Sequence, residues 1–143
     1  MSIVRVVLDT NVLVAASRSR DGASFAVMQA LRAGRFTALA SVPLVLEYEA
    51  VLKRETHVAA GKAGALGVDA MLDAMLLRVQ PVHIHYLWRP QLRDPADEMV
   101  LETALNGRAD ALVTFNLADF AAASNFALPV ITPVALLRRL NEE

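Results

Sequence analysis

The chain has 143 residues, of which 55% are hydrophobic and 20% are charged, and it contains no cysteine. This composition excludes a disordered protein, a disulfide-stabilised scaffold and any cysteine-based zinc site or nucleophile. The formal net charge of −1 excludes binding to nucleic acid through bulk positive charge alone. The length predicts a single domain over residues 1–143.

No stretch of the sequence predicts a membrane span. The longest uncharged run, residues 120–137, is interrupted by Pro129 and Pro133. The apolar start carries Asp9 and Asn11, which do not belong in the core of a signal peptide. We therefore expect no membrane association and a cytoplasmic location.

Short apolar runs alternate with amphipathic stretches along the whole chain. In chain order we expect a strand at 3–8, helices at 12–16 and 24–33, a strand at 36–40, helices at 41–54 and 68–78, a strand at 82–86, a helix at 94–105, strands at 111–114 and 130–132, and a helix at 133–140. Residues 57–67, which include three glycines, are either a loop or a poor helix. This alternation predicts an α/β protein, a three-layer α/β/α sandwich around a mostly parallel sheet.

Acidic and amide side chains fall where predicted strands end or predicted helices begin. Asp9 ends the first strand, Glu47 lies in the first turns of the helix after the second strand, and Asp97 lies in the first turn of its helix. Asn116 and Asp119 follow the strand at 111–114. The carboxyl ends of parallel strands lie at one edge of the sheet, and so do the N-termini of the helices that follow them. We therefore expect these side chains to meet at that edge.

Asp97 stands out because of the helix face on which it lies. It shares that face with Val100 and Leu101, whereas Glu98 and Glu102 are expected to point away from the buried stripe. A carboxylate at the end of a buried stripe needs a partner, because an unpaired buried charge is costly. Asp97 is therefore either an acid of a functional site or a capping residue near the helix dipole.

Local patterns leave the roles of the other acids open. Asp94 precedes a proline at a helix start, which is typical of an N-cap. Glu47 and Glu49 flank the apolar stripe of their helix about equally, so periodicity does not decide whether either is functional or merely solvated. Asp9 is either the N-cap of the following helix or a member of a site shared with the other acids.

Motifs in several parts of the chain resemble the PIN-domain nuclease family. The opening VVLDTNVLV resembles the family's first strand and first acid, and Glu47 matches its second acid. The segment RDPADEMVLETALNGRADALVTFNLADF, residues 93–120, resembles the region of the third and fourth acids, and LPVITPVALLRRL resembles the last strand and helix. Within the family, Asp94-Pro95-Ala96-Asp97 resembles the branch of VapC-like toxins from toxin–antitoxin pairs.

The resemblance implies a PIN-like fold and a metal-dependent ribonuclease that leaves a 3′-hydroxyl and a 5′-phosphate. It assigns Asp9, Glu47 and Asp97 as metal-site acids. Family members often place the fourth acid where this chain has Asn116, so we expect Asp119, three residues later, to serve as that ligand. The resemblance also implies an antitoxin protein as a partner and a homodimer.

The chemistry of the residues is consistent with that activity. Carboxylates held close together repel each other unless a cation neutralises them, and oxygen ligands suit Mg²⁺ or Mn²⁺. Such an ion can activate a water for in-line attack on an RNA phosphodiester. The residues expected either to orient these groups or to cap helices are Thr10, Asn11, Asp94, Thr114 and Asn116. Arg18 and Arg20, after the first helix and near the expected site, either hold RNA phosphates or are solvated.

Two other functions fit parts of the pattern. Asp9 after a strand is typical of phosphatases with an aspartyl nucleophile, but those enzymes need a second acid where this chain has Asn11. The second alternative is a non-catalytic binding module on the same fold that has lost its fourth ligand at Asn116. Metal-dependent cleavage of single-stranded RNA distinguishes the nuclease from both.

Overall fold

The centre of the molecule is a parallel β-sheet. The computed structural model describes residues 4–58, 64–87 and 89–142, and within them the sheet has five strands in the order β3-β2-β1-β4-β5. Each neighbouring pair of these strands runs parallel. The strands are β1 (Arg5–Leu8), β2 (Thr37–Ala40), β3 (Val79–Pro81), β4 (Ala111–Val113) and β5 (Val130–Ile131). The predicted α/β class with a parallel sheet is confirmed.

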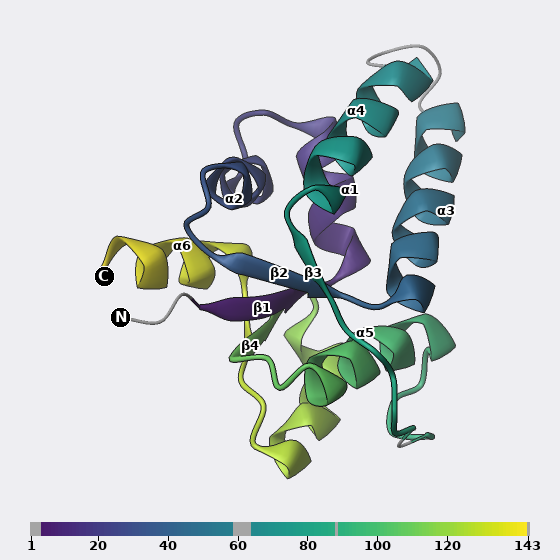
Figure 1. Cartoon of the computed structure of the whole chain (residues 1–143), viewed down its shortest axis with the longest axis vertical. Coiled ribbons are helices and arrows are strands. Elements are labelled where there is room, and N and C mark those ends of the chain that lie inside the picture. Colours follow the sequence, from purple (N-terminus) through teal and green to yellow (C-terminus); the bar gives the residue numbers. More distant parts are fainter. Residues whose placement is uncertain (1–3, 59–63, 88, 143) are drawn as a thin grey trace.

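Helices cover both faces of the sheet. They are α1 (Thr10–Arg18), α2 (Ala23–Arg32), α3 (Val42–Val58), α4 (Gly64–Leu76), α5 (Pro95–Asn106), the 3₁₀ helix η1 (Leu117–Phe126) and α6 (Pro133–Asn141). Figure 1 shows α1 to α4 on one side of the sheet and α5 with the yellow-green η1 on the other. None of the described helices is long and apolar enough to cross a membrane.

The central strand β1 explains why the sheet holds together. Val6, Val7 and Leu8 are completely buried, as expected of a parallel strand that is covered on both faces. Leu8 pairs with Val113 of β4, so the residues that follow these two strands emerge side by side at one edge of the sheet. This edge contains the candidate site.

Most of the predicted elements are present with shifted ends. The helix expected at 94–105 begins at Pro95, and the Asp94 carboxylate accepts a hydrogen bond from the Ala96 amide at 2.9 Å, so the predicted N-cap is confirmed. Within the uncertain stretch 57–67, α3 continues to Val58 and α4 begins at Gly64, while residues 59–63 lie outside the described residues. The sequence did not predict η1.

The prediction of a strand at residues 82–86 is wrong. The third strand is Val79–Pro81, and one further sheet bond, from the Val82 amide to the Ala40 carbonyl at 2.9 Å, follows it within the described residues. The amides of His85 and Tyr86 donate instead to the Asn106 side chain of α5, at 2.9 and 3.0 Å. The alternating pattern arose because Val82 is buried while its neighbours are exposed, not because the segment pairs in the sheet.

The acids Glu98 and Glu102 of α5 are buried, at 4% and 3% exposure, which corrects the expectation that they point away into solvent. Residues 89–93 cross that side of α5 and cover both carboxylates. Glu98 accepts hydrogen bonds from the amides of Gln91 and Leu92 at 2.7 and 2.8 Å. Glu102 accepts two bonds from the Arg89 guanidinium at 2.9 and 2.8 Å. Periodicity marks the faces of a helix but not the segment that will cover each one.

Gly107 lies where three parts of the chain come together after α5. A β-carbon added at this position would lie 2.8 Å from a methyl group of Val82, 3.0 Å from the Thr103 carbonyl and 3.1 Å from a methyl group of Leu39. The backbone φ of −85° is open to any residue, so the close approach is what requires glycine.

We expect Gly107→Ala to lower the free energy of unfolding by about 1–3 kcal/mol, because the added methyl group overpacks the contact between α5 and the sheet. Urea denaturation followed by circular dichroism measures the change. Gly22→Ala is the comparison variant, since the nearest atom to its new β-carbon is 4.0 Å away, and at this N-cap position its effect should stay within about 1 kcal/mol. Equal effects of the two substitutions would contradict this account.

Candidate active site

Three aspartates interact at the carboxyl edge of the sheet. Asp9 directly follows β1, Asp97 lies in the first turn of α5, and Asp119 lies in the first turn of η1. The pKa of Asp97 is raised to about 7, first because burial disfavours its charge and then because the charges of Asp9, Asp94, Asp119 and Glu98 repel it. The three elements therefore bring their carboxylates close enough to repel one another.

Asp9 is 6% exposed and is held by a neighbouring strand end. Its Oδ2 atom accepts a hydrogen bond from the Thr114 hydroxyl at 2.7 Å. Burial raises the pKa of Asp9, the charge of Asp119 raises it further, and the hydrogen bond from Thr114 acts in the opposite direction. Asp9 occupies the N-cap position of α1 but makes no side-chain capping hydrogen bond there. The backbone amides of Thr10 and Asn11, in the first turn of α1, also lower its pKa, so the carboxylate lies between the start of this helix and the other acids.

Thr114 links this aspartate to two amide residues. Its completely buried hydroxyl also accepts hydrogen bonds from the Asn11 side chain at 3.3 Å and from the Asn116 backbone amide at 3.0 Å. The Asn11 Oδ1 atom is buried and has no hydrogen-bond partner within the described part of the chain. Thr114 therefore connects the Asp9 carboxylate to an amide side chain whose oxygen has no partner among the described residues. Thr10 is the first residue of α1.

Asp97 and Asp119 line the same hollow. It has a volume of about 590 Å³ and lies between the start of α5 and η1. Its lining residues are Gln91, Leu92, Arg93, Asp94, Asp97, Ala118, Asp119, Ala121 and Ala122. Asp97 is partly exposed and makes no capping hydrogen bond to the described residues, in contrast to Asp94. We call this space the acidic hollow.

Asn116 and Asp119 both lie at the start of η1, three residues apart. Asn116 is the N-cap residue of this helix, and its side chain makes no capping hydrogen bond. Asp119 is exposed, and its charge contributes to the raised pKa values of both Asp9 and Asp97. Of these two residues, Asp119 is the one that interacts with the other acids.

Glu47 and Glu49 have different surroundings in the structure, a difference that the periodicity of the helix did not predict. Glu47 is half-buried in α3, whereas Glu49 is exposed and pairs with Lys53 at 3.4 Å. The intervening Tyr48 is buried, and its hydroxyl donates a hydrogen bond to the carbonyl of Leu8, the residue before Asp9. Glu47 thus belongs to a turn that is anchored beside the site, although its charge is not among those that shift the pKa of Asp9 or Asp97.

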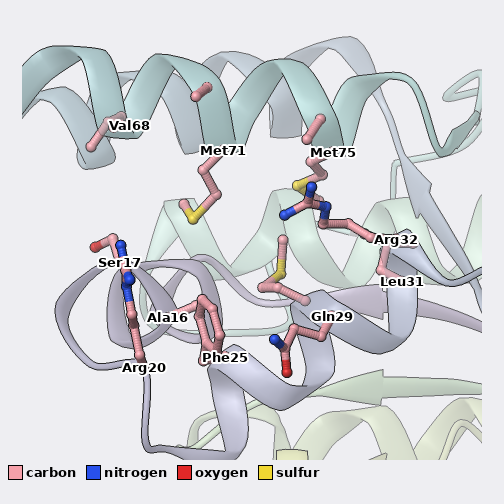
Figure 2. Close-up of a pocket in the computed structure, with 14 residues that line it drawn as sticks. Ala16, Ser17, Arg20, Phe25, Gln29, Leu31, Arg32, Val68, Met71 and Met75 are labelled. Atoms are coloured by element: carbon pink, nitrogen blue, oxygen red, sulfur yellow. The ribbon is translucent and has the colours of Figure 1, made fainter. Parts of the chain in front are cut away.

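Arg18 and Arg20 do not lie where the sequence suggested. Helix α1 starts at the edge with Asp9 and runs away from it, so Arg18 in the last turn lies about 12 Å further along the axis. Arg20 lines a different groove, of about 400 Å³, between α1, α2 and α4. In Figure 2 Arg20 and Arg32 lie towards opposite ends of this α2–α4 groove, and Met71 points into it from α4.

Arg93 is the basic residue that the structure adds to the site. It lines the acidic hollow together with Asp94, Asp97 and Asp119. The signal in the sequence is its position directly before the Asp94 N-cap, because the residue before a helix at this edge lies beside the helix N-terminus.

The oxygen atoms at this edge suit a hard divalent cation that keeps several water molecules in its coordination shell. Repelling carboxylates and an uncommitted amide oxygen at Asn11 are the oxygen donors that Mg²⁺ and Mn²⁺ prefer. Among the described residues, no three or more His, Asp or Glu side chains lie close enough together to hold a metal ion by themselves. The arrangement therefore suits an ion bound by a few carboxylates and by water or substrate oxygens.

The comparisons with known proteins agree with this architecture. The family model of the PIN domain matches residues 5–118. Among solved structures, the chain resembles the crystal structure of VapBC2 from Rickettsia felis bound to a DNA fragment from their promoter, with a TM-score of 0.59 over 90% of this chain and 98% of that chain. The sequence identity is 17%, so this likeness shows a common fold. No curated protein matches the chain. Because the matched residues run from β1 to the start of η1, the protein belongs to the PIN-domain family.

Proposed function

We propose that this protein is a metal-dependent endoribonuclease that hydrolyses RNA phosphodiester bonds with an activated water, and that it is the toxin of a toxin–antitoxin pair. The observation that carries the proposal is the mutual repulsion of Asp9, Asp97 and Asp119 at one edge of the sheet. Such repulsion is unfavourable in the protein alone and becomes favourable when a cation binds. Membership of the PIN-domain family, which is a nuclease family, supports the same activity.

In this proposal Asp9, Glu47, Asp97 and Asp119 are the metal-site acids that, together with water, hold Mg²⁺ or Mn²⁺, and Asp119 takes the place of the family's fourth acid. A bound ion supplies the charge that activates water and stabilises the charge developing on the phosphate. Thr114 orients the Asp9 carboxylate through its 2.7 Å hydrogen bond. Asp94 fixes the first turn of α5, and with it the backbone that carries Asp97, by capping the Ala96 amide. Thr10, Asn11 and Asn116 are the neighbouring groups that orient waters or cap helices.

We expect Asp97→Asn to lower cleavage of single-stranded RNA by at least ~100-fold while the fold stays intact, because the amide removes a charged metal ligand. A fluorogenic RNA assay in Mg²⁺, Mn²⁺ and EDTA measures the activity, and circular dichroism checks the fold. Glu47→Gln should also lower the rate. Glu49→Gln is the matched control on the same helix, because Glu49 pairs with Lys53 at the surface, and it should cleave like the wild type.

Cleavage by Asp97→Asn at nearly the wild-type rate would refute the site. A wild-type chain that binds RNA without metal-dependent cleavage would be the non-catalytic module. Release of phosphate from a monoester, with RNA left intact, would indicate the phosphatase.

The raised pKa of Asp97 predicts how the stability of the metal-free protein depends on pH. The unfolded carboxyl loses its proton near 3.8, whereas the folded carboxyl keeps it until about 7. Between these values the folded state binds more protons, so the free energy of unfolding falls as the pH rises. The Tm measured in EDTA should therefore decrease from about pH 4 to about pH 7. Asp97→Asn should flatten this dependence and raise the Tm at the upper end, and an unchanged slope would contradict the charge repulsion.

We expect Asp119→Ala to weaken Mn²⁺ binding and RNA cleavage more than Asn116→Ala does, because a hard cation gains more from a carboxylate than from an amide. Isothermal titration with Mn²⁺ measures the binding. Asn116→Asp should tighten Mn²⁺ binding if it fills a vacant ligand position. If Asn116→Ala were the more damaging change, the amide would hold the ligand position and Asp119 would serve only the start of η1.

The α2–α4 groove supports an acidic protein partner. Phe25, Met28 and Met71 give it an apolar lining, and Arg20 and Arg32 are its charged residues, with no Asp or Glu among the lining residues that the structure describes. Methionine side chains adapt to the shape of a bound helix. We propose that the antitoxin docks here with an amphipathic segment that carries acidic side chains.

A different surface supports the homodimer. A hollow of about 250 Å³ beside the edge strand β3 is lined by Ala40, Ser41, Val42, Val45, Leu46, Leu76, Val79, Pro81, Val82 and His83. Val42 and Leu46 are well exposed in this α3–β3 face, and none of its lining residues is an Asp, Glu, Lys or Arg. Two copies of an uncharged face can meet without repulsion, whereas two copies of the arginine-bearing groove cannot. We therefore propose that the second copy binds at the α3–β3 face.

Light scattering tests both assignments with two variants. We expect twice the mass of one chain for the wild type and a single-chain mass for Leu46→Glu, because a buried charge disrupts an apolar interface. Met71→Glu should keep the dimer mass and lose binding to the protein encoded by an adjacent inhibitor gene. A monomeric wild type would refute the dimer, and full partner binding by Met71→Glu would refute the docking site.

A further inference from the structure

We infer that Arg93 binds a phosphate of single-stranded RNA beside the bond that is cleaved, and so is the residue that brings the polyanion into the acidic hollow. This inference rests on the proposed ribonuclease function and adds to it a specific substrate contact. The candidates nominated from the sequence for that contact were Arg18 and Arg20, which lie at the far end of α1 and in the α2–α4 groove.

The first argument is the placement of the Arg93 side chain. Arg93 is exposed, and it is the one Lys or Arg among the described residues that line the acidic hollow. Its guanidinium makes no ion pair or hydrogen bond with the described part of the chain, although Asp94 is its neighbour in sequence. Asp94 is already engaged as the cap of α5. The guanidinium is therefore available to an external anion.

The second argument is the rigidity of the backbone on both sides of Arg93. On one side, the Glu98 carboxylate accepts the amides of Gln91 and Leu92 at 2.7 and 2.8 Å. On the other side, Asp94 accepts the amide of Ala96 at 2.9 Å. A cation carried on an anchored backbone loses less conformational entropy when it binds a ligand. This anchoring also gives a role to the burial of Glu98.

The third argument is the charge in the hollow. Asp94, Asp97 and Asp119 line it, so an RNA phosphate that approaches meets three carboxylates. A metal ion offsets part of that repulsion at the bond to be cleaved, but the flanking phosphates need a cation of their own. A guanidinium suits this task because its planar array of donors matches two phosphate oxygens.

RNA binding and its dependence on salt test the inference without relying on catalysis. Fluorescence anisotropy with a labelled single-stranded RNA is measured on Asp97→Asn, so that the probe stays intact, with and without the second substitution Arg93→Ala. We expect Arg93→Ala to weaken binding about tenfold and to reduce the slope of log Kd against log salt by about 0.7, the value for one phosphate contact on a single strand. Arg93→Lys should restore the salt slope and part of the affinity.

Arg139→Ala is the matched control, because it removes the same charge from an exposed position on α6 outside the acidic hollow. In the otherwise wild-type chain, Arg93→Ala should raise the KM for RNA with a smaller effect on kcat. Unchanged affinity and salt slope in Arg93→Ala, or an equal loss in Arg139→Ala, would overturn the inference while leaving the ribonuclease proposal intact. A wild-type chain that cleaves no RNA in Mg²⁺ or Mn²⁺ would instead refute the proposed function.

Discussion

The hydrogen bond from the Thr114 hydroxyl to the Asp9 carboxylate joins the ends of the two central strands, and the candidate site is built around it. Leu8 and Val113 are paired in the parallel sheet, so the residues after them must emerge as neighbours. One of these neighbours is a buried acid and the other a buried hydroxyl that can donate to it. The parallel topology also places the starts of α1 and η1 at this edge, because each follows its strand directly.

The acids at this edge of the sheet lower the stability of the fold because their charges repel one another. Burial and like charge raise the pKa of Asp97 to about 7, which means that the folded protein resists its ionisation. A protein selected for stability alone would place amides or apolar side chains here. A cation relieves the repulsion, so the same residues become favourable when the site is loaded. In the proposed function, metal binding at this site therefore also stabilises the fold.

Helix α5 serves two surfaces with neighbouring residues. Asp97 lies in its first turn at the acidic hollow. Glu98, Glu102 and Asn106, which are spaced four residues apart, bind residues 85–86 and 89–92. These three polar side chains replace the sheet pairing that the segment gives up after β3. Both Glu102 oxygens and the Glu98 Oε1 atom accept hydrogen bonds there, whereas Glu98 Oε2 is buried with no partner in the described part of the chain. The wall of the acidic hollow therefore depends on residues that do not line it.

Local patterns in the sequence determined four of the five described strands, most helices and the acids that end up at one edge. The β-branched run before Asp9 had to be a buried strand, and Asp94-Pro95 had to begin a helix, because these preferences act within a few residues. The PIN-domain motifs added a prediction of which acids along the chain belong to one site. Periodicity also identified the buried stripe of α5.

Only the tertiary structure decided which neighbour covers each face. It buried Glu98 and Glu102 under residues 89–93, moved the third strand to Val79–Pro81, and distinguished the half-buried Glu47 from the exposed Glu49. It also placed Arg93 at the acids and left Arg20 in a separate groove. The physical reason is that periodicity specifies which side chains share a face, whereas burial and charge depend on contacts between segments far apart in the chain.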